Sequence, residues 1–162
     1  MKVLGFGILF ILLMAAAVVL VGQLGLLKGR MPADLGVREG RLKPPSSTPN
    51  SVSSQADLYP NHPQRDYARI APLGYAGDGD AAMARLATLL KGMDRTTVVT
   101  QQADYLYVQC TTAVLKFTDD VEFWLDRSAH VIQVRSASRL GASDLGVNRK
   151  RVEKIRAQFQ KN

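Results

Sequence analysis

Cysteine and histidine are scarce in this chain of 162 residues, which contains one cysteine, Cys110, and two histidines. A single cysteine excludes a disulfide within the chain and any CxxC redox or zinc motif. His62 stands beside Pro63 with no second ligand nearby, which favours a solvated histidine over a metal site. The HExxH, GxSxG and P-loop patterns are also absent. We therefore expect no metal, no cofactor and no catalytic residue that a known motif would identify.

Basic residues outnumber acidic ones, and the formal net charge is +7. An excess of this kind is compatible with an anionic membrane surface, an acidic ligand or nucleic acid. The sequence shows no nucleic-acid-binding motif, so we expect no nucleic-acid partner. Membrane lipid is the first partner expected, and proteins of the cell envelope are the second. No motif indicates an oligomeric state.

A long apolar run occupies residues 1–27. Its uncharged part, from Val3 to Leu27, has 25 residues, and as a helix it would be about 37 Å long, enough to cross a hydrocarbon core of about 30 Å. A cleaved signal peptide is the rival interpretation, because Lys2 and the small residues 15–17 suit one. The apolar run continues through residues 18–21, past that cleavage point. We therefore expect an uncleaved transmembrane anchor.

Residues 28–66 hold six of the chain's seven prolines and many serines, without helical or strand periodicity. We expect a Pro/Ser-rich extended segment, in which residues 28–42 act as a tether and residues 49–55 pack on the domain that follows. A flexible spacer along its whole length is the simpler alternative.

Residues 67–162 show the periodicities of a small α+β domain. The predicted order is strand, helix, four strands and helix, over residues 67–73, 80–92, 96–101, 105–112, 119–125, 131–135 and 148–160. Asp80 is the expected N-cap of the first helix, and Gly92 is expected to end it. Strands joined by short links form antiparallel sheets, and two amphipathic helices can cover one face of such a sheet. We therefore predict an N-terminal transmembrane helix followed by a two-layer domain, with an antiparallel sheet in the order βαββββα.

The hairpin between residues 119–125 and 131–135 has a register that the side chains define. If Leu125 lies opposite Ile132, apolar residues meet on one face, and Glu122 meets Arg135 on the polar face. A slip by one residue would bury Arg135. We therefore predict an ion pair between Glu122 and Arg135, worth about 0.2 to 1 kcal/mol if it stays solvated. Cys110, in the preceding strand, is expected to pack as a buried small residue.

Several polar residues are expected to have structural roles, as members of ion pairs or as helix caps. Asp119 falls on the apolar face of its strand and needs a partner there. Ser138 and Arg139 are the nearest candidates by register. Asp144 is expected to fix the loop before the last helix, and Asn148 is expected to cap that helix.

A second group of residues is the candidate binding surface for an anionic partner, either a lipid headgroup or an acidic protein surface. Trp124 is a large aromatic residue on an otherwise hydrophilic strand face, where it marks a binding patch or is covered by the preceding segment. The tentative ligand-binding residues are Trp124, Arg135, Arg139, Arg149 and Arg151. This interpretation makes the domain a non-catalytic binding or assembly module.

The alternative is an enzyme that acts on an envelope lipid or an anionic small molecule, with Asp119, Glu122 and Asp144 as acid and base. Adjacent Asp119 and Asp120 point to opposite faces of a regular strand, so they cannot form a paired-carboxylate site. Ion pairs and a helix cap account for these carboxylates better than catalysis does.

The stretches DDVEF, from residue 119, and VIQVRSASRLGASDLGVNRKRVE, from residue 131, resemble the bacterial and plastid family of unknown function DUF1499. The resemblance extends to the segment PNSVSSQ at residues 49–55, and it implies no established activity. Relatives typically carry cysteines at positions that correspond to Pro45 and Ser51, which implies a dispensable disulfide and an oxidising compartment.

The side of the membrane on which the domain lies depends on two arguments that disagree. The resemblance favours a single-pass protein of the bacterial inner membrane with a periplasmic domain. The basic residues that follow the span, beginning with Lys28 and Arg30, would by the positive-inside rule stay in the cytoplasm.

Overall fold

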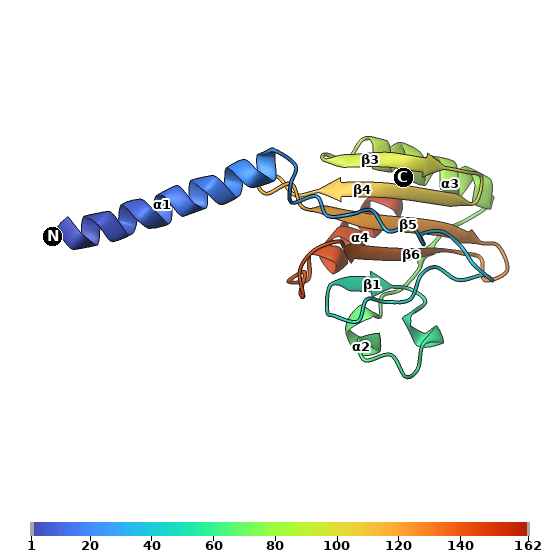
Figure 1. Ribbon diagram of the computed structural model, residues 1–162. Helices are drawn as coiled ribbons and strands as arrows, with labels where there is room; N and C mark the ends of the chain where they lie inside the picture. Colours follow the sequence, from blue (N-terminus) through green and yellow to red (C-terminus); the bar gives the residue numbers. More distant parts are fainter. Residues whose placement is uncertain (1, 162) are drawn as a thin grey trace.

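The computed structural model describes residues 2–161. Met1, the first residue of the predicted anchor, and Asn162, the last residue of the predicted domain, lie outside the described residues. Its elements, shown in Figure 1, are α1 (Lys2–Gln23), β1 (Ser51–Ser53), the 3-10 helix η1 (Ala56–Leu58), α2 (Arg65–Ala68), β2 (Leu73–Gly74), α3 (Gly79–Lys91), β3 (Thr96–Gln101), β4 (Tyr105–Thr111), β5 (Thr118–Asp126), β6 (Val131–Ser138) and α4 (Val147–Phe159). This is the predicted α+β class with an N-terminal apolar helix.

The six strands form one antiparallel sheet in the order β1-β6-β5-β4-β3, and β2 also pairs with β6. Strands β3 to β6 pair with their neighbours in sequence because short turns connect them. In the β5–β6 hairpin, Leu125 lies opposite Ile132 and Glu122 lies opposite Arg135. The predicted register is therefore confirmed.

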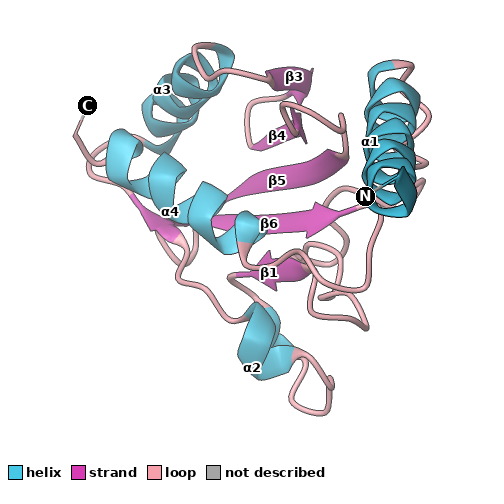
Figure 2. Cartoon of the chain, turned by 90° about the vertical axis from the view of Figure 1, so that its left-hand side faces the viewer, coloured by secondary structure: helices cyan, strands magenta, loops and turns pink. Residues whose placement is uncertain are grey.

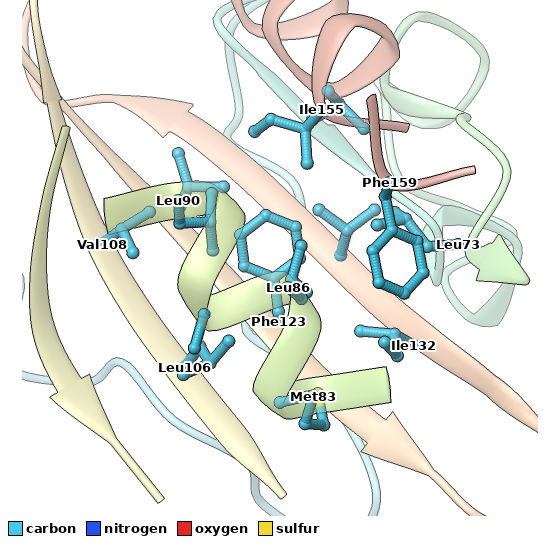
Figure 3. Close-up of a cluster of buried hydrophobic side chains, with 14 of the residues drawn as sticks. Leu73, Met83, Leu86, Leu90, Leu106, Val108, Phe123, Ile132, Ile155 and Phe159 are labelled. Atoms are coloured by element: carbon cyan, nitrogen blue, oxygen red, sulfur yellow. The ribbon is translucent and has the colours of Figure 1, made fainter. Parts of the chain in front are cut away.

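Helices α3 and α4 cover one face of this sheet, as Figure 2 shows. Their apolar residues recur at helical spacing and meet alternate residues of β5, among which Phe123 is fully buried. Figure 3 shows Leu86 and Leu90 of α3 and Ile155 and Phe159 of α4 around this ring. Burial of these side chains provides the main driving force for folding of the domain.

The first predicted strand is wrong in most of its length, because residues 65–68 form the short helix α2 and only Leu73 and Gly74 pair as β2. The guanidinium of Arg149 donates hydrogen bonds to the carbonyls of Tyr67 and Arg69, 2.5 and 2.9 Å away. This contact with α4 holds a backbone that local propensity alone would extend.

The boundaries of α3 differ slightly from the prediction. Its N-cap is Asp78, whose Oδ1 accepts a hydrogen bond from the amide of Ala81 at 2.8 Å, and Asp80 lies in the first turn. The helix ends at Gly92, as predicted.

Helix α1 is apolar, and its residues 5–21 are exposed. Residues Gly5–Gln23 have a mean hydropathy of 2.7, so by length and composition this helix can cross a membrane. The helix ends at Gln23, whose side-chain amide donates a hydrogen bond to the carbonyl of Val114 at 2.8 Å. A Cβ on Gly22 would lie 2.6 Å from the carbonyl oxygen of Leu115. The end of α1 thus packs closely on the loop between β4 and β5 (Figure 1).

The chain that follows α1 crosses the second face of the sheet. We call residues 31–45 the strap. Its residue Leu42 is 1% exposed and packs with Tyr105 and Tyr107 of β4, and Leu35 and Val37 join this cluster. Residues 31–42, most of the segment predicted as a tether, therefore pack on the domain and cover the polar strand face that carries Trp124.

Candidate functional site

Glu122 and Arg135 form the ion pair that the register predicts, but the pair is buried, with the two residues 0% and 3% exposed. Nη1 of Arg135 lies 3.7 Å from Oε2 of Glu122, too far for a hydrogen bond. Oε1 of Glu122 accepts hydrogen bonds from the Tyr105 hydroxyl and from the Gly36 amide of the strap. Nε of Arg135 donates to the carbonyl of Pro44. Burial lowers the pKa of Arg135, against the opposing charge of Glu122.

Arg139 pairs with Asp120 on this same strap-covered face. Its Nη2 lies 2.6 Å from Oδ1 of Asp120 and 3.1 Å from the Tyr107 hydroxyl. That hydroxyl donates to Asp120 at 2.6 Å, and burial followed by this hydrogen bond raises the pKa of Tyr107. Arg139 is therefore not the partner of Asp119, because successive residues of β5 face opposite sides of the sheet.

Most of the arginines and the tryptophan predicted to bind a ligand are used within the fold. Trp124 is half-buried and packs against the cluster that Leu42 of the strap forms with Tyr105 and Tyr107. Arg135 and Arg139 hold carboxylates beneath the strap, and Arg149 binds backbone carbonyls at α2. Of the five predicted ligand-binding residues, Arg151 lines a hollow at the surface.

Asp119 is buried on the α4 side of the sheet, where Arg151 is its partner at 2.5 Å. Nη1 of Arg151 also donates to Oδ1 of Asn148 at 2.7 Å and to the Ser136 hydroxyl at 3.1 Å. One guanidinium thus joins β5, β6 and α4. The predicted neighbour Ser138 does lie opposite Asp119 in the ladder.

Asp144 organises the start of α4. Its carboxylate accepts hydrogen bonds from the amides of Gly146 and Asn148, at 3.0 and 2.9 Å, and from the hydroxyl of Tyr67. Burial alone would raise the pKa of Asp144, and these hydrogen bonds bring it below its ordinary value. The predicted cap at Asn148 is wrong. Gly146 occupies the N-cap position, and the Asn148 amide group donates to the carbonyl of Asn50 instead.

The three carboxylates of the enzyme alternative do not meet. Asp119 and Asp144 lie on the α4 side of the sheet, whereas Glu122 lies beneath the strap. Among residues 2–161, no group of three or more acidic, histidine or cysteine side chains could hold a metal ion.

A basic hollow of about 420 Å³ lies between the α3–β3 turn, the end of β4 and the first half of α4. Its lining residues are Met93, Asp94, Arg95, Thr96, Cys110, Thr111, Thr112, Ala113, Val147, Lys150, Arg151 and Lys154. Within the described part of the chain, no carboxylate pairs with Arg95, Lys150 or Lys154, whereas Arg151 is held by Asp119. Burial raises the pKa of Cys110, which favours the neutral thiol there. Three unpaired cations against one lining carboxylate, Asp94, give this hollow a positive potential.

An apolar hollow of about 250 Å³ adjoins the basic one. It is lined by Thr112, Phe117, Asp119, Ser138, Leu140, Gly141, Ser143, Asp144, Leu145 and Val147. Thr112 and Val147 line both hollows, so the two share a wall.

The end of β4 lines the basic hollow and the β4–β5 loop lines both hollows. This end of the sheet lies next to the end of α1, as Figure 1 shows. The β4–β5 loop, which contributes Thr112 and Phe117, is the loop that contacts Gly22 and Gln23. A Cβ on Gly29 would lie 3.1 Å from Cγ of Leu140. The chain that leaves α1 therefore also contacts Leu140, which lines the apolar hollow.

Sequence reasoning placed Lys150 and Lys154 on a basic helix but did not single them out, although their spacing of four puts them on one side of α4. Arg95 carried no sequence signal, because it reaches the hollow from a turn between α3 and β3.

The comparisons with known proteins identify the family and nothing further. No curated protein and no solved structure matches the chain. A family model does match, over residues 41–159, and this range holds the sheet, α2, α3, α4 and both hollows. The chain therefore belongs to the family described as protein of unknown function, DUF1499.

Proposed function

We propose that this protein is a membrane-anchored, non-catalytic binding module whose basic hollow holds the phosphate-bearing headgroup of an anionic phospholipid. The observation that carries this proposal is the group of unpaired cations, Arg95, Lys150 and Lys154, around a hollow at the end of the domain that adjoins α1. Phosphate oxygens are strong acceptors for such groups.

The position of α1 supports a lipid as the source of the phosphate. If α1 spans the bilayer, Gln23 lies near the interface, because the helix ends there. Leu24 and Leu26 beyond it are 67% and 70% exposed, and the basic residues Lys28 and Arg30 follow. The contacts of Gln23 with Val114 then bring the basic hollow to the level of the headgroups, where each lysine or arginine contributes about 1 kcal/mol.

The proposal includes a periplasmic location at a bacterial inner membrane. The amide of Ser46, next to Pro45, donates a hydrogen bond to the Ser51 hydroxyl at 2.8 Å. The two positions that correspond to cysteines in relatives are thus close together, which suits a bridge in an oxidising compartment. Protease treatment of spheroplasts, which cleaves only an outward-facing domain, decides between this side and the cytoplasmic one.

The double substitution Lys150→Glu and Lys154→Glu tests the headgroup site. We expect the wild-type chain in mild detergent to bind phosphatidylglycerol in preference to phosphatidylcholine. We expect the double variant to bind phosphatidylglycerol about tenfold more weakly or worse, because two attractive charges become repulsive. Native mass spectrometry of the full chain, titrated with each lipid, measures both affinities.

The matched control is the pair Arg38→Glu and Arg41→Glu, which changes the net charge by the same amount on the exposed part of the strap. This control keeps the wild-type affinity if the basic hollow is the site. Equal losses in both variants would show that only the total charge matters, and the proposed site would be wrong.

A further inference from the structure

We infer that the apolar hollow takes part of an acyl chain of the same lipid, so that the two hollows together hold one phospholipid molecule. This inference rests on the proposed function, because it takes the basic hollow as the headgroup site. It adds the class of ligand: an intact lipid with its acyl chain, as opposed to a free phosphate compound.

The shared wall is the first reason. Thr112 and Val147 line both hollows, so the two adjoin each other, as a single ligand that spans both requires. Lys150 and Lys154 line the basic hollow, and Phe117, Leu140 and Leu145 line the apolar one. A phospholipid has this same division, with a charged group joined to an apolar chain.

The rim of the apolar hollow is the second reason. Leu145 is 86% exposed and Leu140 is 44% exposed. Leu145 also has a φ of 51°, a left-handed conformation that is unfavourable for leucine. Asp144 holds this turn through the Gly146 and Asn148 amides. A strained backbone that presents a large apolar side chain to water is typical of a functional contact.

The occupant is a membrane lipid because of where the rim lies. Leu140 touches the chain just after α1 at Gly29, and Val114, 55% exposed, lies in the loop that binds Gln23. The apolar residues thus continue the apolar surface of α1, while the cations beside them complement an anionic headgroup. Both features favour a lipid entering from the adjoining bilayer over a soluble ligand.

The test compares two probes on the full chain in mild detergent by native mass spectrometry: phosphatidylglycerol, and sn-glycerol 3-phosphate, which lacks acyl chains. We expect the wild-type chain to bind phosphatidylglycerol at least tenfold more tightly, a gain that burial of about two methylene groups provides. The double variant Leu140→Asn and Leu145→Asn is expected to bind sn-glycerol 3-phosphate as the wild type does and to lose the tenfold advantage. Asparagine adopts positive φ readily and adds no charge, so the variant keeps both the turn and the potential of the basic hollow.

The matched control is Leu58→Asn, at a leucine that is 47% exposed and lines neither hollow. This control is expected to keep the advantage of phosphatidylglycerol. Circular dichroism verifies that each variant is folded. If the double variant is not folded, Leu140→Asn alone takes its place in the binding comparison.

Two results overturn the inference but leave the headgroup site intact. The first is that the wild-type chain binds the two probes with equal affinity. The second is that the double variant still binds phosphatidylglycerol more tightly than sn-glycerol 3-phosphate, as it would if a protein surface covered the apolar hollow. Failure of the wild-type chain to bind either probe would instead overturn the proposed function itself.

Discussion

Replacing Arg135 with methionine is expected to lower the free energy of unfolding of the domain by about 3–5 kcal/mol, because it leaves a buried carboxylate without its counterion. Glu122 is 0% exposed, and its Oε2 already has no hydrogen-bond partner among the described residues. The remaining donors, the Tyr105 hydroxyl and the Gly36 amide, reach only Oε1. A small domain has a total stability of only about 5–15 kcal/mol, so this loss is large. Urea unfolding of the full chain in detergent, followed by the fluorescence of Trp124, measures it.

Two control variants separate the buried charge from the lost side chain. Arg127→Met breaks a pair with Asp80 whose side chains are 55% and 57% exposed, and it should leave the stability nearly unchanged. Adding Glu122→Gln to Arg135→Met should restore part of the loss, since no buried charge then remains. If Arg135→Met costs no more than Arg127→Met, the ion pair does not stabilise the fold in the way that we describe.

Replacing Leu42 with alanine is expected to cost about 2–5 kcal/mol of unfolding free energy, the usual range for a fully buried leucine. Leu42 lies in the strap and is 1% exposed, packed on Tyr105 and Tyr107. The cavity that alanine leaves would also admit water near Glu122, whose partner Gly36 belongs to the same strap. Urea unfolding of the full chain measures the change.

Leu58→Ala is the control for the strap, because Leu58 is 47% exposed on η1. It should change the unfolding free energy far less than Leu42→Ala does. Equal, small effects of the two substitutions would mean that the strap is loose, as the sequence suggested for residues 28–42, and that it is not part of the domain.

The hairpin of β5 and β6 was predictable because its side-chain alternation permits only one register. A shift by one residue would have placed Arg135 in the core against Val121, at a cost much larger than any turn preference. Helices α3 and α4 were predictable for a similar reason, since their apolar residues recur at helical spacing.

The strap could not be predicted because it has no periodicity to detect. Its backbone is held by side chains far away in the sequence, such as Glu122, which binds the Gly36 amide across 86 positions. The alternation in β5 correctly separated the two faces of the sheet but could not show that the polar face is covered. Asp119 and Asp120 were therefore assigned to opposite faces correctly, while the partner of Asp119, Arg151, was missed.

The candidate site was predictable only in its general character. The basic residues of the last helix were recognised, yet local sequence does not show which of them have partners. Arg149 turns toward the carbonyl of Tyr67, while Lys150 and Lys154 remain unpaired beside the turn that carries Arg95. Only the packing of α4 on the sheet distinguishes the arginines that hold the fold from the lysines that face the hollow.

Native mass spectrometry of the full chain, extracted from its own membrane in mild detergent without added lipid, is the decisive test of a lipid bound beside α1. The lipid site that we propose at the end of α1 predicts one retained phosphate-bearing lipid for each wild-type chain, and none for the Lys150→Glu and Lys154→Glu variant. A wild-type chain that carries no lipid, or that retains neutral and anionic lipids alike, would contradict the account.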